Sequence, residues 1–279
     1  MMNINPPNNF PAPWANAWGE DAYGYWQSFE IIDPKQGKEV QQIMRWIPDG
    51  VFKMGSPEDE AERIASEEKQ HEVVIKQGFW LADTACTQEL WQMVMGKNPS
   101  HFDDNEQNPV ENISWHDSQA FIKKANQFLG EYFLRLPSEA EWEYSCRAGT
   151  TTPFSTGETI TTEQANFNGN YPYETKKAPV EKGQFREKTM PVVSFSPNPW
   201  GLYQMHGNVW EWCYDVFQKD YATVNEPGDA SSERVLRGGC WIDDARNLRS
   251  AFRGAYTPDF RSVGGIGLRL AGGFDPQAP

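Results

Sequence analysis

Four cysteines are the residues of this sequence best suited to nucleophilic or redox chemistry: Cys86, Cys146, Cys213 and Cys240. A reactive thiolate needs a basic neighbour that lowers its pKa, and a zinc site needs cysteines or histidines at short, paired spacing. No two of the cysteines form a Cys-x-x-Cys pair, and no histidine lies near Cys240 in the sequence. The four thiols are therefore predicted to be reduced and mostly buried.

The acidic segment at residues 57–70 has the residue types that bind calcium. Its carboxylates lack the spacing of an EF-hand loop, so a solvated, exposed acidic loop is the favoured interpretation. The four histidines are scattered without ligand spacing and are predicted to be structural.

The composition is typical of an irregular, loop-rich globular protein. The chain has 279 residues, enough for one large domain or two small ones, with 12 Trp, 16 Phe, 10 Tyr, 23 Gly and 20 Pro. Its formal net charge of −14 opposes nucleic acid and membranes as partners, since both attract clustered Lys and Arg. No signal peptide and no membrane-spanning apolar run is recognisable, so the predicted location is cytoplasmic.

Local signals predict an α+β fold with little regular secondary structure. Two strand-like runs flank Pro48-Asp49-Gly50, which is a hairpin turn signature, and residues 71–81 are predicted to form a further strand. Three helices are expected after them. Their capping residues are Thr87 for a helix ending near Met95, Ser114 with Asp117 for 115–129, and Ser138 with Glu141 for a short third helix.

Apolar spacing indicates which helix faces enter the core. The first helix is expected to bury Leu90, Trp91 and Val94, and the second Phe121, Ala125 and Phe128. Residues 147–200 are predicted to be loop.

Residues 234–269 mix two kinds of position. One kind is suited to holding a backbone in place: Arg237, Gly238, Gly239, Arg249, Arg253 and Arg269. The other kind shares no chemistry: Cys240, Trp241, Ile242, Asp243, Asp244, Phe252, Gly254, Ala255, Tyr256, Phe260, Ser262 and Val263. A rigid frame that carries apolar, acidic and aromatic side chains is typical of a binding surface. We name these two sets the frame and the varied positions.

Several motifs occur in the order seen in the formylglycine-generating-enzyme (sulfatase-modifying factor) family, which this sequence resembles over residues 42–272. They include Arg-Leu-Pro-Ser-Glu-Ala-Glu-Trp-Glu at 135–143, His-Gly-Asn-Val-Trp-Glu-Trp at 206–212, Arg-Gly-Gly at 237–239 and Gly-Leu-Arg at 267–269. The resemblance implies a C-type-lectin-like fold with long loops. It divides the chain into an aromatic-rich extension packed on the main domain (1–41), a main domain (42–273) that contains a variable ligand-binding region (234–270), and a tail (274–279).

The resembled enzymes oxidise a cysteine with copper held by two thiolates, a soft ligand pair that selects Cu(I). Counted from Gly238-Gly239, the two thiolate positions fall on Asp243 and Leu248, and neither can supply a thiolate. Cys240 stands where the family usually has Ser, and one thiol does not make a two-thiolate site. The chain is therefore not expected to be an enzyme of this kind.

The C-terminal stretch also resembles the variable region of proteins diversified by a diversity-generating retroelement, which are built on the same scaffold. It follows their frame through Thr-Pro-Asp at 257–259 except for Cys240 in a Ser place. Trp241 stands at a Trp place of that frame. The other varied positions contain no Lys, Glu, Gln, Met or Trp, which adenine-directed mutation of an Asn codon cannot produce. The predicted function is non-enzymatic binding of a protein or other macromolecule, with Trp241, Phe252, Tyr256 and Phe260 as aromatic anchors and Asp243 and Asp244 for charge selectivity.

The family resemblance further implies a structural calcium site. Its ligands would be the side chains of Gln204 and Glu211 and the backbone carbonyls of Gly207 and Val209. Gln204 is uncharged and would weaken such a site, and the alternative is that Glu211 pairs with an arginine of the frame. No other cofactor is expected.

Two other functions stay open at this point. One is an oxidoreductase of the same superfamily with an altered active site. The other is an adaptor in a bacterial defence or signalling complex, which would bind a partner protein through residues 1–40. Those residues are rich in Trp and Tyr and are predicted to be ordered, because disordered segments are poor in aromatics.

Overall fold

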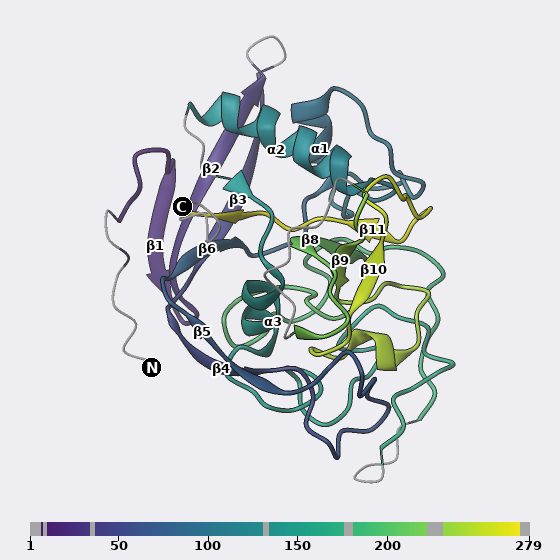
Figure 1. The fold of residues 1–279 in the computed structure, drawn as a ribbon. Helices are drawn as coiled ribbons and strands as arrows, with labels where there is room; N and C mark the ends of the chain where they lie inside the picture. The colour runs from purple at the N-terminus through teal and green to yellow at the C-terminus, as the bar shows by residue number, and fades with distance from the viewer. Residues whose placement is uncertain are drawn as a thin grey trace.

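The computed structural model describes Pro7 and residues 10–33, 37–130, 134–175, 181–221 and 231–273. The tail predicted at 274–279 lies outside these residues. Within the described ranges, short strands and three α-helices alternate with long loops, which confirms the predicted α+β class (Figure 1). No helix in this part of the chain is long and apolar enough to cross a membrane.

The largest sheet joins segments from both ends of the described chain. Its strands lie in the order β1-β2-β3-β6-β12-β7. Their bounds are β1 Ala17–Asp21, β2 Gly24–Asp33, β3 Lys38–Ile47, β6 Phe79–Ala82, β12 Ala271–Gly272 and β7 Leu134–Arg135. β12 pairs antiparallel with both β6 and β7, so the C-terminal segment completes the sheet. β1 and β2 come from the predicted extension, and the predicted boundary at 41/42 falls inside β3.

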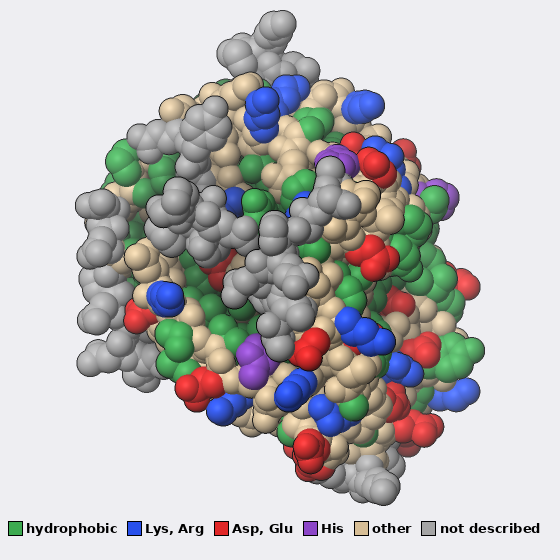
Figure 2. All heavy atoms as spheres, in the orientation of Figure 1, with side chains coloured by type: hydrophobic (Ala, Val, Ile, Leu, Met, Phe, Trp, Pro, Cys, Tyr) green, Lys and Arg blue, Asp and Glu red, His purple; other side chains and the backbone are tan. Residues whose placement is uncertain are grey.

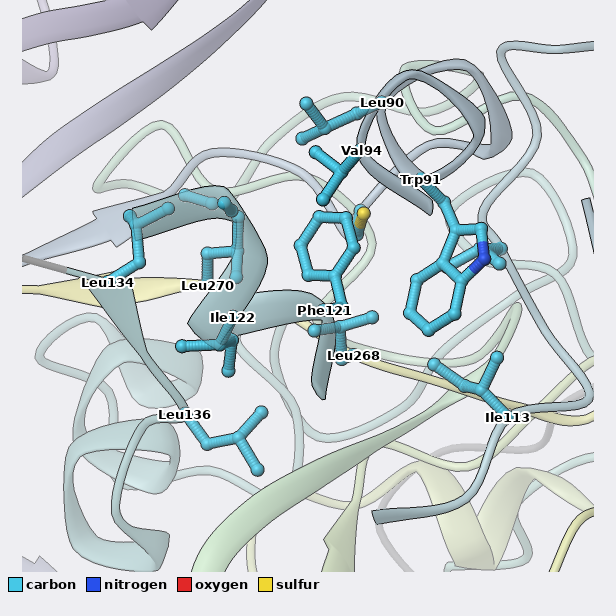
Figure 3. Packing of buried hydrophobic residues seen from close by; sticks show 14 of the residues in the cluster. Leu90, Trp91, Val94, Ile113, Phe121, Ile122, Leu134, Leu136, Leu268 and Leu270 are labelled. Carbon is cyan, nitrogen blue, oxygen red and sulfur yellow. The ribbon is translucent and has the colours of Figure 1, made fainter. Parts of the chain in front are cut away.

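Two helices pack on this sheet and begin where the sequence predicts. α1 spans Gln88–Met95, with the Thr87 hydroxyl accepting from the Leu90 N–H, and α2 spans Trp115–Leu129 behind a complete capping box. Figure 3 shows their apolar side chains facing each other, with the rings of Trp91 and Phe121 stacked at 4.9 Å. The core position predicted for Phe128 is wrong: this side chain is 50% exposed at the end of α2, where helical spacing continues beyond the packed face.

A second, four-stranded sheet carries the C-terminal stretch, in the order β10-β9-β8-β11. Its strands are β8 Trp210–Val216, β9 Arg234–Arg237, β10 Gly254–Tyr256 and β11 Ile266–Gly267. Helix α3, Glu139–Arg147, contacts β8 and β9, and its predicted capping box is present. The described residues between α3 and β8 form loops and turns, as predicted.

The hairpin predicted around Pro48-Asp49-Gly50 is wrong. Strand β4, Gly50–Met54, pairs with β5, His71–Ile75, whereas β3 pairs with β2 and β6. Pro48 and Asp49 therefore carry the chain from one sheet into another. The single strand predicted at 71–81 is likewise two strands, β5 and β6, which belong to different sheets. Turn chemistry is local, but the choice of partner strand is a tertiary property.

The acidic segment at 57–70 is a loop, as predicted, but it is not solvated throughout. Glu68 is 0% exposed and Glu60 is 9% exposed. Buried carboxylates need cationic partners, because an unpaired buried charge is costly. Glu60 and Glu68 both pair with Arg249 of the frame.

Candidate functional site

The frame has four arginines, Arg237, Arg249, Arg253 and Arg269. All four are buried, and each pairs with a carboxylate. Arg237 pairs with Glu143 of α3 and also donates to the carbonyl oxygens of Ser250 and Phe252. A guanidinium group offers five N–H donors in a rigid plane, so one side chain can fix both a carboxylate and two carbonyls. Arg237 thereby holds the backbone at 250–252 against α3.

Arg249 and Arg253 tie the same stretch to two distant segments. Arg249 donates to Glu60 and Glu68, each at 2.7 Å. Arg253 donates to both carboxylate oxygens of Glu139, at 2.6 and 2.8 Å. Charge-assisted, two-point contacts of this kind fix orientation as well as distance. Buried ion pairs therefore hold the segment between β9 and β10 at several points.

Two glycines shape the start of that turn. Gly238 and Gly239 have φ of +99° and +73°, a region that favours glycine. A Cβ atom on Gly239 would lie 2.8 Å from Leu248 Cδ1 and 3.1 Å from the Asn247 carbonyl oxygen. Only glycine therefore lets the two arms of the turn approach this closely.

The varied positions lie largely on the outside of this held backbone. Ile242, Tyr256 and Val263 are 53%, 45% and 64% exposed, and Asp244 is exposed as well. Half-buried positions lie among them: Trp241, Asp243, Phe252, Gly254, Ala255, Phe260 and Ser262. In Figure 2, hydrophobic side chains gather with acidic ones on the side of the molecule where β10 and β11 lie in Figure 1.

Two of the predicted ligand-binding positions do not face outward. Cys240 is 3% exposed. The Asp243 carboxylate accepts from the Cys240 backbone N–H at 2.8 Å and from the Asn247 side chain at 3.1 Å. Asp243 thus closes the turn internally, and Asp244 is the neighbouring acid that is left to face a ligand.

The predicted aromatic anchors have different settings. Tyr256 and Phe260 stack on each other, with ring centroids 4.0 Å apart. Phe252 lies 5.9 Å from the ring of Trp210. Stacking holds both rings in place, and Tyr256 is the exposed member of the pair.

Trp241 is held in place by residues that are not among the varied positions. Its indole N–H donates to the Gly264 carbonyl at 2.6 Å. Its ring meets Phe102 edge-on at 5.3 Å and stacks on Phe185 at 5.9 Å. The residue is therefore half-buried, and it supports the surface more than it projects from it.

Glu111 is a supporting residue that sequence reasoning missed. Its carboxylate accepts from the backbone N–H groups of His101, Phe102 and Gly264, at 2.6, 2.8 and 2.9 Å. It is fully buried, and burial raises the pKa of its carboxyl, while these N–H groups act against that rise. Only its place in the Pro-Val-Glu-Asn motif at 109–112 could have drawn attention to it. It joins the loop at 101–102 to the varied stretch.

Burial keeps the thiols of Cys146 and Cys240 protonated. The Cys146 sulfur lies 3.7 Å from His206 Nε2, which also contacts the Ser155 hydroxyl at 2.9 Å. Burial raises the pKa of the Cys146 thiol to about 12 and lowers the pKa of His206 to about 4, so both are neutral near pH 7. Burial, and next the charge of Asp243, raises the pKa of the Cys240 thiol well above its ordinary value. A neutral thiol is a weak nucleophile and a poor metal ligand.

Of the residues predicted to bind calcium, Glu211 pairs with an arginine of the frame. Glu211 accepts from Arg269 at both oxygens, at 2.8 and 2.9 Å, and from the Trp142 indole at 2.7 Å. This is the pairing weighed as the alternative, and it leaves the carboxylate little capacity for a cation. The Gln204 Oε1 atom is buried without a partner among the described residues, so one acceptor stays open. As arranged, the set fits calcium poorly, and calcium here stays a prediction.

Known proteins resemble this chain in sequence and in fold. The pattern of the sulfatase-modifying factor enzyme 1-like domain matches residues 29–273. The formylglycine-generating enzyme of Streptomyces coelicolor is 33% identical over 236 residues, which cover 77% of this chain and 71% of that enzyme. The inactive C-alpha-formylglycine-generating enzyme 2 of Bos taurus is 32% identical over 173 residues, 59% of this chain and 50% of that protein.

A solved structure with the same fold is Treponema denticola variable protein 1. It superimposes with a TM-score of 0.68 at 27% identity and covers 84% of this chain and 95% of that one. The resemblances predicted from the sequence, to the enzyme family and to variable proteins, are thereby confirmed.

Proposed function

This chain belongs to the sulfatase-modifying factor enzyme 1-like family, and from that premise we propose that it is a non-enzymatic binding protein of the diversity-generating-retroelement variable class. Its ligand is a protein or another macromolecule, which it contacts through the varied positions at 240–263. The similarity to a solved variable protein over 84% of the chain supports this function.

One observation carries the proposal: the frame arginines are buried, whereas the varied positions between them are exposed or half-buried, with Cys240 as the exception. Arg237, Arg249 and Arg269 are 0% exposed, whereas Ile242 and Val263 are more than half exposed. Substitution of an exposed side chain changes stability little, whereas loss of a paired buried charge costs several kcal/mol. A chain with this division can change its surface without losing its fold.

An oxidoreductase with an altered active site is the second candidate, and the names of the enzyme relatives favour it. The copper thiolate positions argue against the family's own reaction, since they hold Asp243 and the fully buried Leu248. Anaerobic titration with Cu(I) separates the two functions. The binding proposal expects no tight stoichiometric complex with Cu(I). Formation of such a complex would favour the oxidoreductase function instead.

The adaptor function can be tested without breaking the fold. β2 supplies the fully buried Phe29 and pairs along β3, so deletion of residues 1–40 would remove core. Trp18 on β1 is 52% exposed and can be changed to Ser instead. If the Trp18→Ser variant no longer binds a partner protein that the native chain binds, and its melting temperature is unchanged, the adaptor function is supported.

A selection experiment tests the binding proposal directly. Seven varied positions that are exposed or half-buried are randomised together in a displayed library: Ile242, Asp244, Ala255, Tyr256, Phe260, Ser262 and Val263. The library is selected against lysozyme, a defined folded protein. Folded binders are expected, because the frame does not depend on these side chains. A library that mostly unfolds, or that yields no binder, contradicts the proposal. A template repeat and a reverse transcriptase gene beside the coding sequence would separately establish diversification.

A further inference from the structure

We propose that the binding surface extends beyond the varied positions onto fixed tyrosines at two borders, Tyr214 on β8 and Tyr171 in the loop before it. Together they form a constant rim that contacts a folded protein partner whatever side chains the varied positions carry. This inference rests on the proposed function and names both its partner class and further residues of the same site.

The first border is reached from the varied anchors by a series of direct contacts. Phe260 stacks on Tyr256, and Tyr256 lies directly opposite Arg234 in the β9–β10 ladder. Directly opposed residues of an antiparallel pair point to the same face. The Tyr256 and Arg234 side chains therefore share one face of the small sheet.

Arg234 continues this surface toward fixed residues. Its guanidinium carbon lies 4.3 Å from the centre of the Trp115 ring, a cation–π distance. Trp115, at the start of α2, lies 6.3 Å from the ring of Tyr214, and Arg234 donates to the Tyr214 carbonyl at 3.0 Å. The Tyr214 side chain is 36% exposed. An aromatic surface thus runs from the varied Phe260 to the fixed Tyr214.

The second border lies beside the other arm of the varied stretch. The Asn168 N–H donates to the Asp243 carbonyl at 3.0 Å, and the Ala245 N–H donates to the Tyr171 carbonyl at 3.1 Å. These two backbone hydrogen bonds hold the loop at 168–171 in register with residues 243–245. Tyr171 is 57% exposed next to the exposed Ile242 and Asp244. The core clusters of the described residues do not include Tyr171.

The shape and charge of this surface favour a folded protein as the occupant. A small molecule is usually enclosed in a cavity of several hundred Å³. The cavity of about 80 Å³ lined by Ser155 and His206 has no varied position in its wall. The net charge of −14 opposes nucleic acid, and the exposed carboxylates of Asp244 and Asp259 add to that. Rigid tyrosines beside adaptable positions are the pattern of protein-binding loops.

The rim predicts a division of roles. The varied positions decide which protein is bound, and the fixed tyrosines add affinity to every variant because tyrosine contributes large contact area at small entropic cost. The rim residues themselves are expected to be unnecessary for folding, since both side chains are exposed.

The test compares three versions of the library described above, each selected against lysozyme under the same conditions. One keeps the native background, one carries Tyr171→Ala with Tyr214→Ala, and one carries Phe128→Ala. Phe128 is a matched control: it is 50% exposed, but it lies at the far end of α2 from Trp115, about 20 Å away along the helix axis. Melting curves of each parent check that the fold is intact.

The best binders from the native and Phe128→Ala libraries are expected to be equal in affinity, and those from the double-tyrosine library at least about ten-fold weaker. Restoring both tyrosines in a clone from the weak library should recover affinity. Equal affinities from all three libraries would overturn the rim and leave the proposed function standing. Failure of all three to give binders would overturn the proposed function, and the rim with it.

Discussion

The Arg249 guanidinium and the Glu68 carboxylate form a two-point ion pair, with N–O distances of 2.7 and 2.8 Å, although the residues are 181 positions apart. Both side chains are 0% exposed. The pair links the turn that carries the varied positions to an acidic segment from the first quarter of the chain. Long-range pairing of this kind explains how buried side chains can hold the backbone that carries the exposed varied positions.

Removing this pair should unfold the protein more easily. Glu68→Gln keeps the size of the side chain but leaves Arg249 with less compensating charge, so the free energy of unfolding should fall by about 3 kcal/mol. Urea titration measures it. The control is Glu58→Gln, an exposed residue of the same segment, which should change stability by less than about 0.5 kcal/mol. Equal losses in the two variants would contradict the role given to Glu68.

Outward varied positions should tolerate substitution that inward ones do not. Ile242→Ser and Val263→Ser should each cost less than about 0.5 kcal/mol, because both side chains are more than half exposed. Leu248→Ala should cost about 2–5 kcal/mol, because this side chain is fully buried beneath the same turn. Thermal unfolding of the three variants gives the comparison. A costly Ile242→Ser variant would mean that the surface supports its own fold.

Glu111 should control the local opening of the varied loop. Glu111→Gln replaces one acceptor oxygen by an amide donor, so at least one of three backbone N–H groups loses its partner. A buried N–H left unpaired costs about 1–3 kcal/mol. Hydrogen exchange at Gly264 should therefore become about ten-fold faster or more. Glu106→Gln, at an exposed neighbouring acid, is the control and should leave the Gly264 rate unchanged.

His206 should make stability depend on pH. Its pKa is about 4 in the folded protein, against 6.5 without burial, so the unfolded chain binds the extra proton first as pH falls. The stability contribution of neutral His206 is complete above pH 6.5 and is lost on acidification toward pH 4. The loss is about 3 kcal/mol.

The measurement is the difference in unfolding free energy between the native chain and His206→Gln, taken at pH 7 and at pH 4. Other groups oppose the trend, since burial raises the pKa of Asp83 to about 6, and the difference between variants removes their contribution. His116→Gln, at a half-exposed histidine, should show no comparable change. A pH-independent difference for His206→Gln would contradict its buried, neutral state.

Local features of the fold could be predicted because their causes are local. The caps of α1, α2 and α3 depend on groups three positions apart in the chain, and all three are present as expected. The strands that flank Pro48-Asp49-Gly50 are also present, but they enter different sheets. Strand pairing depends on which surfaces meet in the folded chain, and a turn motif does not contain that information.

The sequence by itself determined the family and the α+β class, and it predicted the division of residues 234–269 into frame and varied positions. The tertiary structure decided which positions face outward, since Cys240 is buried and Asp243 closes its own turn. It also decided what holds the frame: Glu60, Glu68, Glu139 and Glu143 come from segments whose local pattern indicates only charge. The strength of an ion pair depends on the distance between the charges in space and not on their separation in the sequence, so the partners of the frame arginines are known only from the folded chain.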